Sequence, residues 1–166
     1  MQYNHSQHAV EFLLLYEKER LQQPMELIGE SYDDTTHMNH YRLCYNGHYL
    51  ECHASTEKPM IEIGLQRVSE KLPYTERNLT LALALCHDFT ESNFAAKVHC
   101  YADYDKGTIY FDVWFQSLVP QLPEDLDYMI DGVLILADTI IEGVDDLIEQ
   151  LKSEQENKPN SAKHYD

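Results

Sequence analysis

The strongest structural signal in the sequence is His40-Tyr-Arg-Leu-Cys-Tyr-Asn-Gly-His-Tyr-Leu-Glu-Cys-His53. At its centre, Asn46-Gly47 supplies the two positive φ angles that a type I′ turn requires, and this turn matches the twist of a β-hairpin. A two-residue loop sets the register and places Arg42 opposite Glu51, with complementary charge. We therefore predict an antiparallel hairpin whose core face carries Tyr41, Leu43, Leu50 and Cys52.

A second hairpin is predicted between residues 97 and 115. The strand at Thr108–Phe115 alternates apolar and polar residues, which is typical of an antiparallel sheet with one face on the core. Its partner is Lys97–Ala102, and the loop Asp103–Gly107 joins them. A further strand is predicted at Pro59–Leu65. Its apolar residues, and those of the second hairpin, are Ile61, Ile63, Leu65, Val98, Cys100, Ala102, Ile109, Phe111, Val113 and Phe115.

Three helices are expected, at His8–Leu21, Thr75–Phe89 and Pro123–Leu151. Thr75 is a favourable N-cap, and the helix after it is apolar on most sides, which predicts that it is buried. The last helix combines an apolar stripe with an acidic face of Asp127, Asp131, Asp138, Glu142 and Asp145. The stripe comprises Leu126, Met129, Ile130, Val133, Leu134, Ala137, Ile140, Ile141, Val144, Leu147, Ile148 and Leu151. Gly132 and Gly143 are expected to weaken this helix by about 1 kcal/mol each relative to alanine.

The predicted fold class is therefore α+β: an antiparallel sheet of about five strands packed against helices on one face. The expected element order is α-β-β-β-α-β-β-α. Residues 1–152 form a single domain, and residues 153–166 are polar enough to predict a disordered tail.

The composition argues against several classes of function. The chain has 166 residues, a net charge of -17 and only 12 Lys and Arg residues, which disfavours binding to nucleic acids and anionic membranes. No apolar run reaches the roughly 20 residues of a membrane span, and the N-terminus lacks a secretory signal, so we expect a cytoplasmic protein. None of the four cysteines lies in a Cys-x-x-Cys pair, and no phosphate or dinucleotide motif is present. We expect no cofactor.

A histidine cluster on the first hairpin is the one candidate metal site. The register brings His40 and His53 face to face, with His37 nearby and Cys44 or Glu51 as a further ligand on the same face. Zinc sites usually show tighter spacing, so exposed strand histidines are the alternative interpretation.

Two other patterns have ordinary structural explanations. Cys86 and His87 are adjacent on a helix and point about 100° apart, which disfavours a nucleophilic pair. The loop Asp103–Gly107 lacks the terminal bidentate Glu of a calcium loop and is typical of a hairpin turn. We therefore predict that the chain is not an enzyme.

Aromatic residues on the polar side of the best strand point to protein binding. Tyr110 and Trp114 flank Asp112 on the face opposite the core. If helices cover only the core face, these rings lie in the open, where aromatic residues are typical of protein interfaces. A covering segment is the alternative, so the sequence leaves both open.

The pattern resembles the YbjN-like family of bacterial proteins, whose fold is similar to type III secretion chaperones. The matching residues are the apolar helix that ends at Leu85-Cys-His-Asp-Phe-Thr90, the hairpin from Ala96 to Val113, and the last helix from Asp125 onward. His87-Asp88 departs from the Asn that the family often carries at this point. The resemblance covers about two thirds of the chain and implies a non-enzymatic, regulatory or chaperone-like domain that binds another polypeptide, often as a homodimer.

The function predicted from the sequence is thus protein binding, with Tyr110, Asp112 and Trp114 as the binding residues. The alternative is a small metal-binding protein or metal-dependent enzyme that uses His37, His40, His53 and Cys44. A small-molecule site between sheet and helix is a third possibility, which no polar residue set supports.

Overall fold

The computed structural model describes residues 26–45, 48–92, 96–118 and 123–157. The helix predicted at residues 8–21, the Asn46-Gly47 turn and residues 158–166 of the predicted tail lie outside the described residues.

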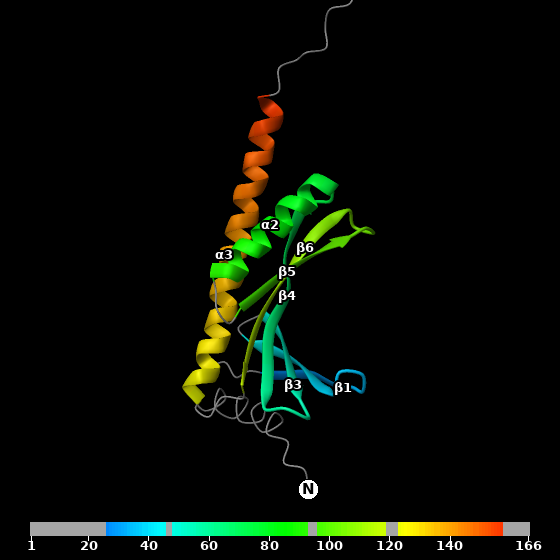
Figure 1. Cartoon of the computed structure of the whole chain (residues 1–166), viewed down its shortest axis with the longest axis vertical. Coiled ribbons are helices and arrows are strands. Elements are labelled where there is room, and N and C mark those ends of the chain that lie inside the picture. The colour runs from blue at the N-terminus through cyan, green and yellow to red at the C-terminus, as the bar shows by residue number, and fades with distance from the viewer. Residues whose placement is uncertain (1–25, 46–47, 93–95, 119–122, 158–166) are drawn as a thin grey trace, which may run out of the picture.

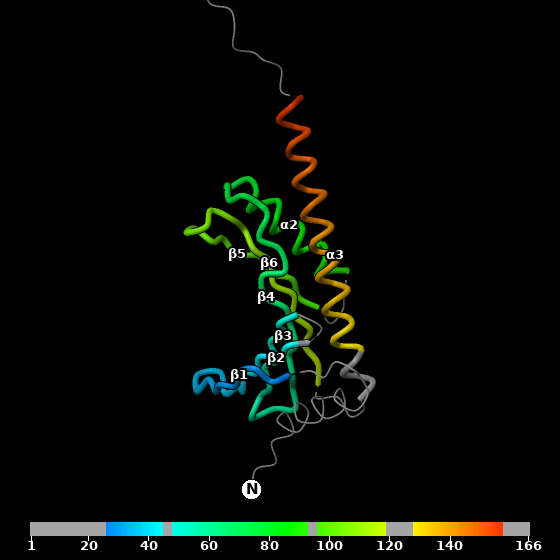
Figure 2. Tube along the Cα trace, turned by 180° about the vertical axis from the view of Figure 1, so that it is seen from behind, coloured from blue at the N-terminus to red at the C-terminus, as the bar shows by residue number. Residues whose placement is uncertain are grey.

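The described residues form an antiparallel sheet and two helices, which confirms the α+β class. The sheet has six strands in the order β1-β2-β3-β4-β6-β5. The elements are β1 (Glu26–Asp33), β2 (Met38–Tyr45), β3 (His48–Ser55), β4 (Met60–Pro73), α2 (Glu76–Ser92), β5 (Ala96–Asp103), β6 (Thr108–Leu118) and α3 (Pro123–Glu156). Figures 1 and 2 show α3 running the length of the molecule, with α2 beside its C-terminal half and β1 near the opposite end.

The first hairpin forms in the register that the sequence predicts. Arg42 pairs with Glu51, Leu43 with Leu50 and His40 with His53. The Arg42 Nε–H donates to Glu51 Oε1 at 2.7 Å, so the expected cross-strand ion pair is present. The predicted core residues Tyr41, Leu43, Leu50 and Cys52 are all buried.

Two strands differ from the prediction. The strand expected to end at Leu65 is the first half of β4, which continues to Pro73. Two irregularities, between Leu65 and Ser69 and between Ser69 and Leu72, shift the phase of its buried side chains and hide the second half from a period-two pattern. The sixth strand, β1, escapes detection because its residues are exposed or half-buried, so it lacks apolar alternation.

The long central strand β4 ties the two halves of the core together. On one side of the molecule β2, β3 and the first half of β4 pack on the N-terminal half of α3. On the other side β5 and β6 pack on α2 and the C-terminal half of α3. Val68 and Phe115 contact both clusters, so one continuous core lies between the sheet and the helices.

Helix α2 begins where the sequence predicts, and the Asn78 N–H donates to the Thr75 hydroxyl at 2.9 Å as in an N-cap. The prediction that α2 is buried on most sides is wrong. Only Ala82 and Cys86 are buried, and Leu83 is 54% exposed. The reason is that α2 lies at the surface and packs through one stripe against β5 and the core.

Helix α3 is longer than predicted, because it continues past Leu151 to Glu156. Its two glycines lie where aromatic rings of neighbouring elements come close. A Cβ atom at Gly132 would lie 3.0 Å from Phe115 Cζ, and one at Gly143 would lie 3.3 Å from Phe89 Cζ. The helix therefore gains close packing at the positions where glycine lowers its intrinsic propensity.

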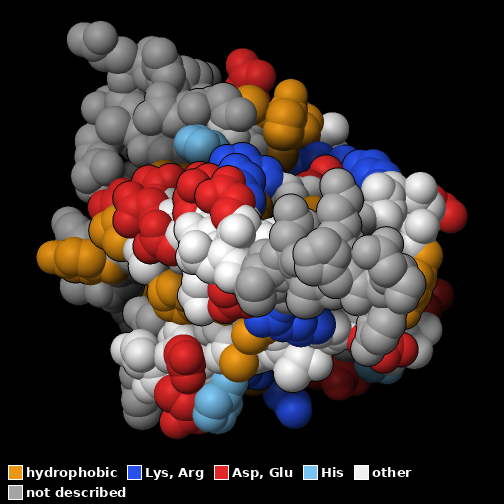
Figure 3. Space-filling view, turned by 90° about the horizontal axis from the view of Figure 1, so that it is seen from above, with side chains coloured by type: hydrophobic (Ala, Val, Ile, Leu, Met, Phe, Trp, Pro, Cys, Tyr) orange, Lys and Arg blue, Asp and Glu red, His pale blue; other side chains and the backbone are white. Residues whose placement is uncertain are grey.

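The outer side of α3 is acidic at the predicted residues Asp131, Asp138 and Glu142, whereas Asp145 is half-buried and pairs with Lys71. The side chain of Asp127 lies outside the described residues. The exposed acidic residues of α3 also include Asp146 and Glu149. Figure 3, seen from above, shows a group of acidic side chains at the upper left and further acidic side chains around the rest of the view. Within the described ranges, no helix is long and apolar enough to cross a membrane.

Candidate functional site

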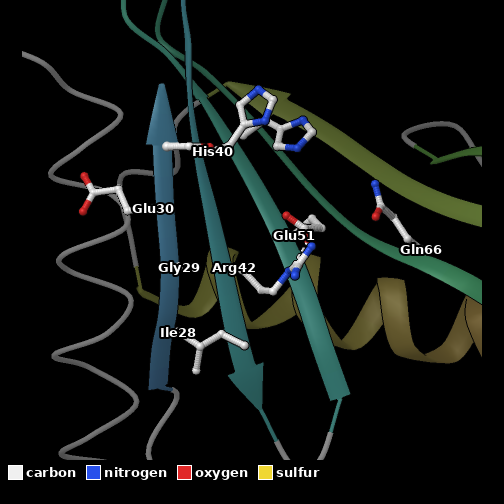
Figure 4. A pocket seen from close by; sticks show the side chains of 9 residues that line it. Ile28, Gly29, Glu30, His40, Arg42, Glu51 and Gln66 are labelled. Carbon is white, nitrogen blue, oxygen red and sulfur yellow. Dashed lines mark hydrogen bonds and ion pairs between the residues drawn. The ribbon is translucent and has the colours of Figure 1, made fainter. Parts of the chain in front are cut away.

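The face of the sheet that points away from α2 and α3 carries the candidate site, and we call it the open face. Its side chains come from alternate positions of β2 to β6, opposite to the core positions. A hollow of about 490 Å³ lies on this face, between β1 and β4. Figure 4 looks onto the hollow, with His40, Arg42, Glu51 and Gln66 around it and a helix passing behind the strands. Glu30 points away from these side chains.

Three rings form a stack beside the hollow, which we call the ring stack: His40, His53 and Trp114. The imidazoles of His40 and His53 lie face to face, with centroids 4.0 Å apart and planes 18° apart. The Trp114 ring follows at a tilt, with its centroid 4.7 Å from that of His53 and the two planes 38° apart. The cross-strand pairing of β2 with β3 brings the two imidazoles together. The ring stack thus joins three strands on the open face.

Trp114 reaches His53 only because Gly64 leaves space. Strand β4 lies between β3 and β6, and Gly64 is the direct partner of Trp114 in the sheet. A Cβ atom at Gly64 would lie 2.5 Å from Trp114 Cδ2 and 2.6 Å from the Val113 carbonyl oxygen. The indole therefore lies across the glycine, an arrangement in which an aromatic side chain shields a strand glycine.

The carboxylate of Glu62 lies beside the ring stack. Glu62 Oε2 lies 3.7 Å from His53 Nδ1, and the interaction with this imidazole lowers the pKa of Glu62. Partial burial lowers the pKa of His40, and the charge of the adjacent His53 acts in the same direction. These shifts keep Glu62 ionised and His40 neutral near pH 7. The stack is therefore an aromatic surface with a carboxylate beside it.

A second cluster on the open face is built around a bulge in β4, at Arg67. This residue has a φ of 53°, an uncommon value for a residue with a side chain. Its guanidinium lies 4.0 Å from the centroid of Tyr110 and pairs with Asp103 at 3.0 Å and with Glu70. Tyr110 in turn stacks on Tyr101, with centroids 5.2 Å apart. Tyr110 therefore contacts both Arg67 and Tyr101 and remains partly exposed.

Asp112 supports this bulge and is not an exposed binding residue. Its side chain is 7% exposed, and Asp112 Oδ1 accepts the Arg67 backbone N–H at 3.0 Å. The prediction that Asp112 contacts a partner is thus corrected by its burial. Tyr110 and Trp114 are half-buried, because other side chains stack against their rings.

We expect the stability of Asp112→Asn to rise relative to wild type as pH increases from about 4 to 7. Burial raises the pKa of Asp112 above its ordinary value of 3.8, although the Arg67 N–H opposes the shift. The stabilising contribution of the protonated acid is complete below the unfolded-state pKa and is lost as pH rises through the folded-state pKa. Asparagine keeps the acceptor oxygen and cannot ionise. Urea unfolding of both proteins at each pH measures the difference.

Asp112→Ala is the matched control, because alanine removes both the charge and the acceptor. Relative to Asp112→Asn it should lose about 1–3 kcal/mol, the cost of an unpaired N–H at Arg67. A stability difference between wild type and Asp112→Asn that does not change with pH would contradict the assignment.

The predicted metal ligands are only partly brought together. His40 and His53 are in contact, but His37 lies in the β1–β2 loop, where it shares a 3.3 Å hydrogen bond with the Tyr32 hydroxyl. Cys44 lies further along β2, opposite Tyr49. Across the ranges that the structure describes, no three His, Cys, Asp or Glu side chains are grouped so as to hold a metal ion.

The other candidate residues have structural roles. Cys86 is buried in the core, whereas its neighbour His87 is exposed, so the two do not form a nucleophilic pair. In the β5–β6 loop, Asp103 accepts the Lys106 N–H at 3.1 Å and pairs with Arg67, and Gly107 has a φ of 64°. This is the hairpin turn that the sequence predicts.

Gly64 and Arg67 are the site residues that sequence reasoning missed. A glycine inside a strand pattern is a known sign of close approach by another group, so Gly64 offered a signal. No feature of the sequence around Arg67 indicates a bulge.

Comparison with known proteins adds a fold relationship. No protein-family profile matches the sequence, and no curated protein matches it. Among solved structures, an uncharacterized protein from Methanothermobacter thermautotrophicus superposes with a TM-score of 0.53. The match has 16% sequence identity and covers 85% of this chain and 97% of that chain. At this identity the likeness extends to the fold alone.

Proposed function

We propose that the chain is a non-enzymatic, chaperone-like protein-binding domain that docks another polypeptide on its open face. The observation that carries this proposal is the ring stack of His40, His53 and Trp114 beside a hollow of about 490 Å³. A sheet surface that faces solvent needs no aromatic rings for stability, because simple polar residues are enough. Here instead rigid rings are held in place and a glycine gives them space.

Such a surface has the properties of a protein interface. Aromatic side chains have few rotatable bonds, so little conformational entropy is lost when a partner covers them. Trp is among the residues most enriched at energetic centres of interfaces. The Arg42–Glu51 pair at the hollow offers donors and acceptors for the rim of such a contact.

The charge of the chain favours a partner with basic side chains. With a net charge of -17, the protein attracts positively charged polypeptides, mainly by faster association. We place this activity in the cytoplasm, where thiols stay reduced, because Cys44, Cys52, Cys86 and Cys100 are free. The resemblance to the YbjN-like family also supports a homodimer, which light scattering of the purified protein tests.

Replacing Trp114 by alanine is expected to weaken partner capture at least tenfold, or about 1.4 kcal/mol, while the fold is retained. The partner is identified by mass spectrometry of proteins captured from native lysate, and its affinity is then measured with purified components. Tyr110→Ala combined with Trp114→Ala should weaken binding further, since both rings lie on the open face.

Tyr128→Ala is the matched control, because Tyr128 is a 76% exposed ring on α3. It should bind the partner as wild type does. Wild-type affinity in a folded Trp114→Ala variant, or an equal loss in Tyr128→Ala, would remove the open face as the docking surface.

A further inference from the structure

Strand β5 forms one edge of the sheet, because among the described strands it pairs with β6 alone. The Val98 N–H points away from β6 and donates to the Thr90 hydroxyl of α2 at 3.2 Å. Neighbouring residues of a strand direct their backbone N–H and C=O groups to opposite sides, so those of Cys100 and Ala102 point outward as well. In Figures 1 and 2 the β5–β6 hairpin projects from the molecule on the side away from α3. This end of β5 therefore offers backbone groups to a further strand.

The charge of this edge fits a second copy of the chain. Two molecules that each carry a net charge of -17 repel one another, so they associate best through a surface of low net charge. The residues of β5 include one lysine and one aspartate, Lys97 and Asp103, whose charges balance. The opposite edge strand, β1, carries Glu26, Glu30 and Asp33 and no basic residue, so two copies of β1 repel.

We propose that two copies of the chain pair antiparallel through β5, around a two-fold axis at Tyr101, and so join their sheets into one. In this register Tyr101 of each copy lies opposite Tyr101 of the other. Cys100 of each copy lies opposite Ala102 of the other, and their outward N–H and C=O groups pair. The axis also places His99 of each copy opposite Asp103 of the other. This inference rests on the homodimer of the proposed function and specifies its interface.

The side chains around the axis suit this pairing. Tyr101 is 43% exposed and stacks on Tyr110, so two copies bring a row of tyrosine rings together on the open face. On the side of the helices, Leu83 of α2 is 54% exposed. It precedes Thr90 by about two helical turns and hence lies on the side of α2 that faces the edge of β5. Pairing in the plane of the sheet covers these side chains and leaves the ring stack accessible.

His99 is exposed, so two substitutions at this position test the register with opposite expected results. His99→Asp places like charges opposite each other twice, by symmetry, and should raise the dissociation constant of the dimer by about tenfold or more. His99→Lys places a cation opposite Asp103 and should lower it. Sedimentation velocity over a concentration series measures both. Ser31→Asp is the matched control, because it adds the same charge to the exposed face of β1, and it should dimerise as wild type does.

A cross-link locates the two-fold axis directly. Residues opposite each other at a non-hydrogen-bonded position of an antiparallel pair have Cα atoms about 4.5 Å apart, within the range of a disulfide. In a Cys100→Ser background, Tyr101→Cys should join two copies through position 101 after mild oxidation with diamide, as peptide mass mapping shows. Tyr104→Cys is the control, because Tyr104 is 73% exposed in the adjoining turn but lies away from the axis. It should not join the two copies.

The outcomes separate this interface from the rest of the proposed function. A chain that sediments as a monomer at every concentration would overturn the interface and the homodimer together, while docking on the open face, tested with Trp114→Ala, would stand. A dimer that His99→Asp leaves intact, or that Ser31→Asp weakens equally, would keep the homodimer and remove β5 as its interface. A dimer that cross-links at Tyr104→Cys and not at Tyr101→Cys would overturn the register.

Discussion

Gly64→Ala is expected to lower the free energy of unfolding by about 3 kcal/mol, at the upper end of the cost of overpacking. The new methyl group would lie 2.5 Å from the Trp114 ring and 2.6 Å from the Val113 carbonyl oxygen. The ring can rotate away, but the carbonyl belongs to the neighbouring strand, so β4 and β6 must separate. Because Trp114 is the one tryptophan of the chain, its fluorescence reports the displaced ring directly.

The same substitution at Gly29 is the matched control. Gly29 lies in β1 of the same sheet, and a Cβ atom there would lie 3.6 Å from Arg42 Cβ, an ordinary contact. Gly29→Ala should therefore stay within about 0.5 kcal/mol of wild type. Urea unfolding monitored by circular dichroism measures the free energy of unfolding of both variants.

A double variant separates the destabilisation caused by the contact with the Trp114 ring from that caused by the contact with the Val113 carbonyl oxygen. In a Trp114→Ala background the ring contact is absent and the clash with the Val113 carbonyl remains. Gly64→Ala should then cost less than in wild type, yet still destabilise. A single Gly64→Ala variant as stable as Gly29→Ala would show that the indole does not lie across β4 as described.

Much of the sheet is predictable because local chemistry and side-chain periodicity agree. Asn46-Gly47 allows one hairpin register, and that register alone places Arg42 against Glu51 and buries Leu43 and Leu50. The Arg42–Glu51 ion pair follows from it without any tertiary information. Residues 97–115 are equally clear, because the apolar residues Ile109, Phe111 and Val113 occupy alternate positions of β6 and are all buried.

The undetected strands carry no such pattern. In β1 the side chains are exposed or half-buried along the whole strand, so burial selects no apolar alternation. In β4 two irregularities interrupt the alternation: Arg67 is exposed where a period of two predicts a buried residue, and the step from buried Ser69 to buried Leu72 changes the phase. A period-two pattern extrapolated from Ile61 therefore fails after Leu65.

To predict the candidate site, the order of the strands in the sheet is needed as well as the strands themselves. Trp114 and His53 lie on strands that are not neighbours, and their contact crosses β4 at Gly64. The sequence indicates that Trp114 lies on the polar face of its strand, but no local sequence feature indicates that β6 pairs with β4. The pairing of His40 with His53 was predictable, and their stacking on an indole was not.

Phe111→Ala should lower the free energy of unfolding by about 3–5 kcal/mol. Phe111 is fully buried, and it is the largest of the side chains with no significant exposure. It points from β6 into the cluster formed with α2 and the C-terminal half of α3. Removing its ring forfeits the transfer free energy of the ring and leaves a cavity that the flanking strands β4 and β5 cannot close. A typical domain has only about 5–15 kcal/mol of stability, so much of it would be lost.

Leu118→Ala tests the same strand without the core contact. Leu118 lies at the end of β6 and is 69% exposed, so its truncation should change stability by no more than about 0.5 kcal/mol. Phe111→Leu, which keeps most of the buried volume, should fall between the two variants. Urea unfolding with equal m-values in all proteins makes the comparison valid. If Phe111→Ala costs no more than Leu118→Ala, the packing of α2 and α3 on this end of the sheet is not what stabilises the domain.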